Sequence, residues 1–292
     1  MKKRIAFIGV GLMGGPLARH LLAAGHPVTV HDIDPAKVDA IVQAGGKKAG
    51  ALDKVPAEVD VIIMSLPSAE AVNEVVKELK LLDTGRNGLI VVDASTIDVE
   101  ASVGLAAQLR RKGIEMLDST ISGSPLMCAA KDTLFMVGGK REIFEQCEPL
   151  FAAMSREWIY VGENGKGLET KLVVNLVLSM NLMALAEGLT LAKKAGLDQL
   201  QTLEVLKKSA AYSKTMDMKG ERMVKKNFVP PIGRQILHLK DIRLILALGA
   251  RLNCPLPLIT LNAQAVASEI SKGRAEWDNS DIISFYSELA NI

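Results

Sequence analysis

A short apolar run that enters a glycine-rich turn constrains the fold of this chain more than any other feature. Ala6-Phe7-Ile8 leads into the turn Gly9-Val10-Gly11-Leu12-Met13-Gly14, and leucines at helical spacing follow it. In a strand–turn–helix unit of this kind, Gly9 allows the tight turn, Gly11 lets the backbone approach a pyrophosphate, and Gly14 lets the helix pack against the strand. The helix N-terminus then offers unpaired amides and a dipole that favour an anion. We therefore predict a dinucleotide site on this turn, including Leu12 and Met13.

Asp32 stands where a dinucleotide site of this type has an acid. A second apolar run, Val28-Thr29-Val30, ends just before it, close to the spacing of about 20 residues expected for the acid that binds the ribose. A carboxylate there accepts hydrogen bonds from the ribose hydroxyls of NAD and repels the 2′-phosphate of NADP. We therefore predict NAD as the cofactor in preference to NADP. A simpler role, in which Asp32 only caps a turn with Asp34-Pro35, is compatible with this one.

The composition is that of a globular protein that handles small molecules. The 292 residues suffice for two domains, and 49% hydrophobic with 23% charged residues is ordinary for a soluble protein. The formal net charge is +2, from 35 basic and 33 acidic residues, so no polybasic surface for nucleic acid is indicated. The three cysteines have no metal-ligand spacing, which predicts reduced thiols in a cytoplasmic protein and no metal site.

Two segments have the composition of membrane-directed sequences. The basic start, Met1-Lys2-Lys3-Arg4, precedes apolar residues, but the glycine turn interrupts them almost at once, so we do not expect a secretory signal. Residues 172–191 are nearly as long as the roughly 20 apolar residues of a spanning helix. They contain Asn175, Asn181 and Glu187, which are costly in lipid. We therefore expect a buried helix between domains and no membrane partner.

The order of apolar runs predicts an α/β domain of Rossmann type followed by an all-α domain. Short β-type runs alternate with helical stretches as far as Gly162, which implies parallel pairing by right-handed crossovers. The predicted strands are Ile5–Ile8, Val28–Val30, Val61–Met64, Leu89–Val92, a weaker Glu115–Leu117, Thr133–Val137 and Trp158–Val161. Residues 1–162 then form the dinucleotide-binding domain, and residues 163–292 form an all-helical domain interrupted by prolines. We expect its first long helix to join the two domains.

Five segments that lie in order along the chain form a more specific pattern. They are the glycine turn, Asp93-Ala94-Ser95-Thr96, the segment from Asp118 to Ser124, Gly165-Lys166-Gly167 with Lys171 and Asn175, and Leu239-Lys240-Asp241. Together they resemble the β-hydroxyacid dehydrogenase family, which includes 3-hydroxyisobutyrate, tartronate semialdehyde and 6-phosphogluconate dehydrogenases. The resemblance spans the whole chain and is to the 3-hydroxyisobutyrate dehydrogenase type.

The resemblance implies a catalytic role for Lys171. It matches the family lysine that exchanges the hydroxyl proton during hydride transfer, and a lysine serves as acid or base when desolvation or a nearby cation lowers its pKa. Asn175 lies four residues on, on the same helix face, where its amide is placed to orient the substrate hydroxyl or Lys171. Taken alone, Lys171 would be an ordinary solvated residue of a first helical turn.

The resemblance also implies a substrate segment. Ser122-Gly123-Ser124 corresponds to the family's Ser-Gly-Gly, whose amides and hydroxyl hold the substrate carboxylate. From the residues alone, a Gly- and Ser-rich turn before Pro125 is an equal interpretation. The chain departs from the family pattern with Thr120 in place of the usual proline and with different residues at 127–132, in a loop that is one residue longer. The identity of the substrate is therefore left open.

Four further residues match cofactor-binding positions of the family. Leu66 and Pro67 follow one predicted strand and Thr96 follows the next, at the carboxyl edge where ligands bind in open α/β sheets. Thr96 would lie near the nicotinamide, and Lys240 would reach the cofactor from the helical domain. The alternatives are a proline-containing turn at Leu66-Pro67, a helix cap at Thr96, and a solvated pair of Lys240 with Asp241.

These observations predict an oxidoreductase that transfers a hydride between NAD and a short 3-hydroxy acid or its semialdehyde. An imine reductase of similar fold is one rival, although those relatives usually lack a lysine at the position of Lys171. A non-catalytic dinucleotide-binding scaffold is another. The apolar faces of the helical domain, together with the family precedent, also predict a homodimer or homotetramer.

Overall fold

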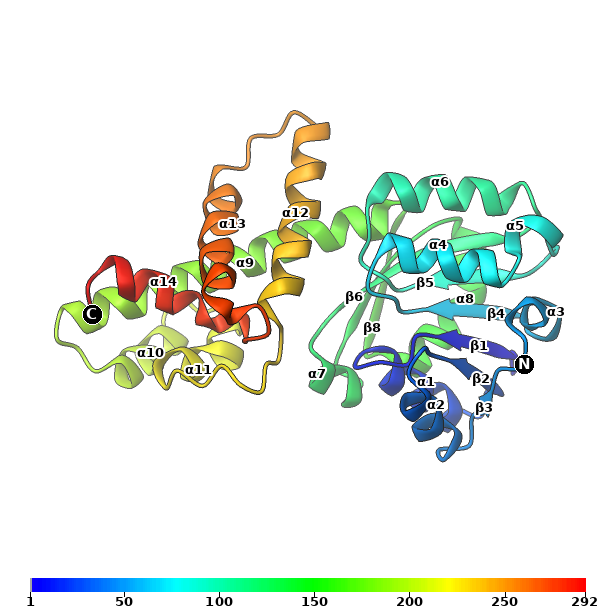
Figure 1. Cartoon of the computed structure of the whole chain (residues 1–292), viewed down its shortest axis with the longest axis horizontal. Helices are drawn as coiled ribbons and strands as arrows, with labels where there is room; N and C mark the ends of the chain where they lie inside the picture. Colours follow the sequence, from blue (N-terminus) through cyan, green and yellow to red (C-terminus); the bar gives the residue numbers. More distant parts are fainter. Residues whose placement is uncertain (1) are drawn as a thin grey trace. The chain divides into compact units, whose positions relative to one another are not determined.

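The computed structural model describes residues 2–292 and contains two compact units. The first extends to Lys171, and the second is Leu172–Ile292 (Figure 1). The division falls inside one long helix, α9 (Lys166–Lys194), which begins in the first unit and has most of its length in the second. The domain boundary between residues 162 and 163 stays a prediction.

A single eight-stranded sheet forms the centre of the first unit. Its strands are β1 (Ile5–Ile8), β2 (Val28–His31), β3 (Lys47–Lys48), β4 (Val61–Met64), β5 (Ile90–Asp93), β6 (Glu115–Ser122), β7 (Leu134–Gly138) and β8 (Glu157–Gly162). They lie in the order β3-β2-β1-β4-β5-β6-β7-β8, and β1 pairs in parallel with both β2 and β4. The predicted Rossmann-type α/β domain is therefore confirmed.

Helices cover both faces of this sheet (Figure 1). They are α1 (Gly14–Ala23), α2 (Pro35–Val42), α3 (Val55–Glu58), α4 (Ala69–Glu78), α5 (Leu81–Thr84), α6 (Val99–Arg110), α7 (Pro125–Ala129) and α8 (Arg141–Met154). Because both faces are covered, β1, β4 and β5 are buried along their whole length and are apolar almost throughout, without an alternating pattern. The main core lies between the sheet and helices α1 and α8, and its buried cluster includes Leu17 and Leu21 of α1 and Phe144 and Phe151 of α8.

The structure corrects the prediction of uniformly parallel pairing. Strands β6 and β7 are antiparallel, with Asp118 opposite Gly138 and Ser122 opposite Leu134. Only a short loop containing α7 joins them, and a parallel connection needs a crossover of a dozen or more residues. Strand β6 is also longer than the predicted Glu115–Leu117. The two-residue strand β3 was not predicted, because its exposed lysines have no apolar pattern.

The second unit is helical, as predicted. Besides α9 it contains α10 (Gln199–Lys208), α11 (Glu221–Val224), α12 (Gln235–Arg251), α13 (Pro257–Glu269) and α14 (Ile282–Leu289). Between residues 172 and 292 the only β-type pairing is an isolated bridge of Arg234 with Asp278. The prolines lie where expected: Pro230 and Pro231 lie between α11 and α12, and Pro257 begins α13.

Helix α9 is long and apolar enough, by length and composition, to cross a membrane. Its most apolar window is 44% buried within the protein, and the core helix of a soluble protein passes the same test. About a third of the way along α9, the amide of Asn175 donates a hydrogen bond to Asp241 of α12. This polar contact is typical of a helix that packs against other helices of a protein.

Candidate active site

The glycine turn has the geometry that a dinucleotide pyrophosphate requires. Gly9 has φ +86°, and its N–H donates to the carbonyl of His31 at 2.8 Å. A Cβ on Gly14 would lie 1.9 Å from the Gly9 carbonyl oxygen, whereas one on Gly11 would meet no protein atom within 4 Å. The residue before α1, Met13, makes no side-chain cap, the Gly15 N–H donates to the Gly11 carbonyl at 2.8 Å, and Pro16 has no N–H. The amides that an anion would meet are therefore those of the turn that leads into the helix. The residues present therefore fit a dinucleotide, with open space above Gly11.

Asp32 braces this turn through both carboxylate oxygens. Its Oδ2 accepts from Val10 N–H at 2.9 Å, and its Oδ1 accepts from Asp34 N–H at 2.9 Å. The Lys37 ammonium lies 3.7 Å from Oδ1, and the Asp32 side chain is 8% exposed. The neighbouring Ile33, by contrast, is 97% exposed. The turn-capping role is thus present, and it places a negative charge directly beside the glycine turn.

Leu66, Pro67 and Thr96 lie just after the carboxyl ends of β4 and β5. The Leu66 N–H donates to Ser95 Oγ at 2.9 Å, which links the two loops. A Cβ on Gly9 would lie 3.0 Å from Leu66 Cδ2, so Leu66 is next to the glycine turn. Pro67 is exposed and Thr96 is half-buried. The predicted cofactor residues of the first unit therefore meet at one edge of the sheet.

Asp93 is a buried carboxyl beneath this edge, at the end of β5. Its Oδ1 accepts from Ser95 N–H at 3.0 Å, while its Oδ2 has no hydrogen-bond partner among the described residues. Burial, with a smaller contribution from Asp118, which the register places beside it on β6, raises the pKa of Asp93 to about 6. Inside the fold the neutral acid is therefore favoured up to about pH 6, well above the range of an ordinary aspartic acid.

Asp93→Asn should stabilise the protein increasingly as the pH rises. The pKa of Asp93 in the fold, about 6, exceeds its ordinary value of 3.8. Its contribution to stability is therefore complete below pH 3.8 and is lost as the pH rises through 6. Because asparagine stays neutral, we expect the gain in unfolding free energy over wild type to grow from near zero at pH 4 to about 1–3 kcal/mol at pH 8.

Urea unfolding at several pH values measures this gain. The exposed Asp39 of α2 provides the control, since Asp39→Asn should shift the unfolding free energy by less than about 0.5 kcal/mol at each pH. A gain at Asp93 that is the same at pH 4 and pH 8 would contradict the prediction.

The predicted substrate segment lies at the end of β6. Ser122 is the last residue of that strand, Gly123 has φ +150°, and a Cβ on Gly123 would lie 2.6 Å from Thr133 Cγ2. Ser124 caps α7, because its Oγ accepts from Met127 N–H at 3.3 Å. The turn interpretation thus holds for Ser124. The carboxylate-binding role of the three residues stays a prediction.

The loop that departs from the family pattern is fastened to the cofactor-binding helix. Its residues form α7, and His20 Nε2 of α1 donates to the carbonyl of Cys128 at 2.9 Å. The Cys128 thiol donates to the carbonyl of Met13 at 3.5 Å. Burial raises the pKa of this thiol to about 11, which leaves it protonated at neutral pH and a poor nucleophile. The longer loop therefore packs on the dinucleotide helix.

Lys171 and Asn175 lie one turn apart on α9, and both are half-buried. Lys171 is the last residue of the first unit, the unit that also contains the glycine turn and Ser122–Ser124. Asn175 belongs to the second unit, where its Nδ2 donates to Asp241 Oδ2 at 3.0 Å. The Lys240 ammonium lies 3.3 Å from Asp241 Oδ1. Asp241 thus orients the Asn175 amide, a role that the sequence did not reveal because 66 positions separate the two.

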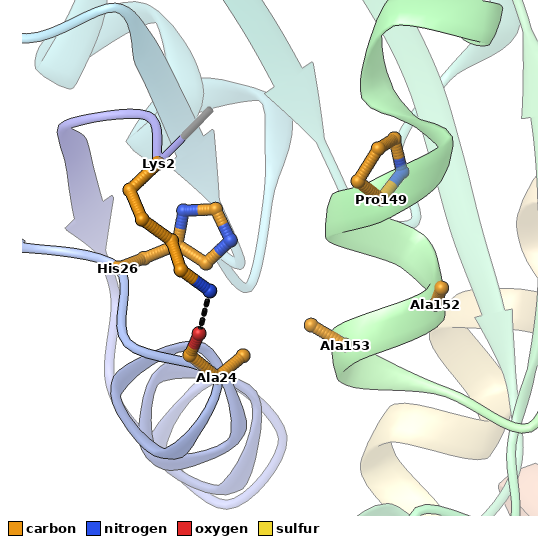
Figure 2. A pocket seen from close by; sticks show the side chains of 6 residues that line it. All are labelled: Lys2, Ala24, His26, Pro149, Ala152 and Ala153. Carbon is orange, nitrogen blue, oxygen red and sulfur yellow. Dashed lines mark hydrogen bonds between the residues drawn. The ribbon is translucent and has the colours of Figure 1, made fainter.

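A cavity elsewhere in the first unit contains none of the predicted site residues (Figure 2). It measures about 430 Å³ and lies beside the residues that precede β1 and β2, at the amino ends of these strands. It is lined by Lys2, Ala24, His26, Pro149, Ala152 and Ala153. Ligands of open α/β sheets bind at the opposite, carboxyl edge, where the candidate site lies.

Family models match almost the whole chain. The model described as the NAD binding domain of 6-phosphogluconate dehydrogenase matches residues 4–162. A second model, described as NAD-binding of NADP-dependent 3-hydroxyisobutyrate dehydrogenase, matches residues 165–286. Both halves therefore match the same class of nicotinamide-dependent dehydrogenases.

Individual proteins agree with these matches. The chain is 31% identical to 2-(hydroxymethyl)glutarate dehydrogenase of Eubacterium barkeri, over 99% of its own length and 96% of the relative's. The solved structure of 3-hydroxyisobutyrate dehydrogenase from Mycobacterium tuberculosis with L-serine has a TM-score of 0.88 and 27% identity. That alignment covers 97% of this chain and 99% of that one. An imine reductase from Myxococcus stipitatus has a TM-score of 0.67 and 16% identity, covering 98% and 99% of the two chains, and shares the fold alone.

Proposed function

Because the chain belongs to the β-hydroxyacid dehydrogenase family, of the 3-hydroxyisobutyrate dehydrogenase type, we propose that it transfers a hydride between NAD and a short 3-hydroxy acid or its semialdehyde. The observation that carries the proposal is that one compact unit contains the glycine turn, the Ser122–Ser124 segment and Lys171. Together they provide a dinucleotide site, a carboxylate site and an acid/base.

Lys171 performs the proton transfer in this proposal. The nicotinamide of the bound cofactor supplies the hydride acceptor for oxidation and the hydride donor for reduction. In oxidation the neutral Lys171 amine takes the hydroxyl proton as the carbinol C–H bond breaks and the carbonyl forms. In reduction the Lys171 ammonium returns this proton to the developing alkoxide. Asn175, oriented by Asp241, positions the reacting oxygen.

The Ser122–Ser124 segment holds the substrate carboxylate. The exposed Gly123 lets a ligand approach the backbone, and neighbouring backbone N–H groups and hydroxyls suit an anion. Two similar enzymes are named for 2-(hydroxymethyl)glutarate and 3-hydroxyisobutyrate. In both compounds one carbon carries a hydroxymethyl group and a carboxylate. We propose the same substrate class for this chain.

A screen for NADH formation across short 3-hydroxy acids tests the function. Turnover of at least one such acid is expected, with none for ketone plus amine. Reduction of imines without oxidation of any hydroxy acid would favour an imine reductase. Tight NADH binding without turnover of either class would favour a scaffold.

The charge at Asp32 should make NADH the better cofactor. A 2′-phosphate would add negative charge beside this carboxylate, and the nearby Lys37 is already paired with Asp32 and Asp34. In Asp32→Asn, kcat/KM for NADH should fall about tenfold, because one of the two N–H groups loses its acceptor. The preference for NADH over NADPH should shrink as the repulsion disappears. Initial rates with both cofactors measure these effects, and a wild-type enzyme that prefers NADPH would overturn the assignment of Asp32.

We also propose a cytoplasmic homodimer or homotetramer. The second unit exposes apolar side chains at helical spacing, namely Val173 and Val177 on α9 and Leu258 and Leu261 on α13. Such exposed apolar faces are typical of surfaces between copies of a chain. The free cysteines Cys128, Cys147 and Cys254 fit a reducing compartment. Light scattering reports the oligomer, and a monomeric mass would contradict it.

A further inference from the structure

Asp118 of β6 binds the start of the helix that carries Lys171. Its Oδ1 accepts from Gly165 N–H at 2.9 Å and its Oδ2 accepts from Leu168 N–H at 3.0 Å. Asp118 is 1% exposed, and burial raises the pKa of its carboxyl while these N–H groups lower it. Both oxygens act only as acceptors, which is the arrangement of a carboxylate. Asp118 therefore satisfies amides that the first turn of α9 would otherwise leave unpaired.

Thr120, two residues along the same strand, binds the same turn through a carbonyl. Its Oγ donates to the carbonyl of Gly167 at 2.9 Å, and Thr120 is fully buried. In an α-helix this carbonyl accepts the backbone N–H of the residue four positions later, which here is Lys171. The Thr120 hydroxyl therefore donates to the same Gly167 carbonyl that accepts the hydrogen bond of the Lys171 backbone N–H.

Glycines allow β6 and α9 to approach this closely. A Cβ on Gly167 would lie 2.3 Å from the Asp118 carbonyl oxygen and 2.8 Å from Asp118 Oδ2. A Cβ on Gly138, which pairs with Asp118 across the sheet, would lie 2.7 Å from Asp118 Oδ1. Side chains at either position would separate the strand from the helix. The glycine at position 167, before Lys171, is therefore explained by the close approach of Asp118 on β6.

We propose that Asp118 and Thr120 are positioning residues for Lys171: they hold the first turn of α9 against β6 and thereby fix where the lysine ammonium lies relative to Ser122. The inference rests on the proposed function of Lys171. Ser122 lies two residues beyond Thr120 on the same strand. Strand β6 therefore connects the substrate segment to the helical turn whose backbone carries Lys171. Nothing in the catalytic chemistry requires either side chain to touch the substrate.

Thr120 offers a matched pair of variants. Thr120→Val keeps the shape and loses the hydroxyl, whereas Thr120→Ser keeps the hydroxyl. We expect Thr120→Val to lower kcat about threefold to tenfold, since small misplacements of an acid/base cost much in rate, and Thr120→Ser to restore it to within about twofold of wild type. Binding of NADH, followed by fluorescence, should stay unchanged in both.

Asp118→Asn tests the two hydrogen bonds that the Asp118 carboxylate accepts from the start of α9. Asparagine has a single acceptor oxygen, so its amino group would face one of the N–H donors. We expect kcat to fall about 10- to 100-fold with little change in NADH affinity. The control is Asp198→Ala, which removes an ordinary helix cap from α10, where Asp198 accepts from Gln201 N–H at 2.7 Å. This control should lower the melting temperature and leave kcat unchanged.

The outcomes separate this inference from the proposed function. If Lys171→Ala loses activity while Thr120→Val and Asp118→Asn keep wild-type kcat, the positioning role is wrong and the function stands. If Thr120→Ser is as slow as Thr120→Val, the hydroxyl is not the cause and the role of Thr120 is also wrong. If Lys171→Ala retains wild-type kcat, the function of Lys171 itself fails. Should Asp118→Asn not fold, the Thr120 pair still decides.

Discussion

Lys171→Ala should lower kcat for the oxidation of a 3-hydroxy acid by about 10²- to 10⁴-fold, the usual contribution of a general acid/base. The hydroxyl proton would then have no positioned acceptor, and an alkoxide would have to form unaided. NADH affinity should stay within about twofold of wild type, because the predicted cofactor residues of the first unit lie on the glycine turn and the β4 and β5 loops. Steady-state kinetics and NADH fluorescence measure the two effects separately.

Lys166→Ala is the matched control on the same helix. Lys166 is exposed at the start of α9 and pairs with Glu169 at 2.6 Å. Lys166→Ala therefore removes a surface ion pair and the same single positive charge that Lys171→Ala removes. Such pairs contribute about 0–1 kcal/mol, and kcat should not change. Near wild-type kcat in Lys171→Ala would end the assignment of Lys171, and equal losses in both variants would point to a general effect of charge or folding.

Gly14→Ala should be the most damaging single change in the dinucleotide site. The new Cβ would lie 1.9 Å from the Gly9 carbonyl oxygen and 2.9 Å from Phe7 Cε1, so the turn must open. We expect a loss of about 2–4 kcal/mol in unfolding free energy. Losing two charge-assisted hydrogen bonds to the pyrophosphate should also weaken NADH binding about 100-fold or more.

Gly11→Ala separates an effect on dinucleotide binding from an effect on folding stability. Because a Cβ on Gly11 would meet no protein atom within 4 Å, the free protein should keep its stability to within about 0.5 kcal/mol. If the pyrophosphate lies over Gly11, NADH affinity should nevertheless fall about tenfold or more, since a charged contact contributes that much. Gly104→Ala, inside α6 and equally open, is the control: it should leave NADH affinity unchanged and should stabilise the protein by up to about 1 kcal/mol, because alanine favours a helix over glycine. Unchanged NADH affinity in Gly11→Ala would show that the dinucleotide does not approach this glycine.

Much of the first unit could be predicted because its strands are continuous apolar runs. Strands β1 and β4 have the predicted bounds, since a strand covered on both faces has an unbroken apolar pattern. The antiparallel pairing of β7 and the short helix α7 were not predicted. The antiparallel pairing follows from a connection too short for a parallel crossover, which the expected alternation of strands and helices did not take into account. Helix α7 packs against α1 through His20, a contact between residues 108 positions apart.

The candidate site shows the same division. The glycine turn and Asp32 carry local signals, namely glycine spacing and a strand end, whereas Lys171 was identified only through the resemblance of five segments to a known family. The side chains that hold them in place carry none. Asp118 looks like any polar residue near a strand end, and its burial against α9 depends on β6, β7 and the helix meeting at Gly138 and Gly167.

The sequence by itself determined the class of fold and the edge of the sheet at which a dinucleotide site is predicted. These follow from local chemistry, because backbone freedom at glycine, apolar periodicity and charge act over a few residues. The lysine proposed to move the proton followed from the resemblance of several segments to a known family. Only the tertiary structure decided that Asp32 braces the glycine turn, that Asp241 orients Asn175, and that Asp118 and Thr120 bind the start of α9. The physical reason is that buried hydrogen bonds join groups 22 to 66 positions apart, and only the packed chain brings their donors and acceptors within reach.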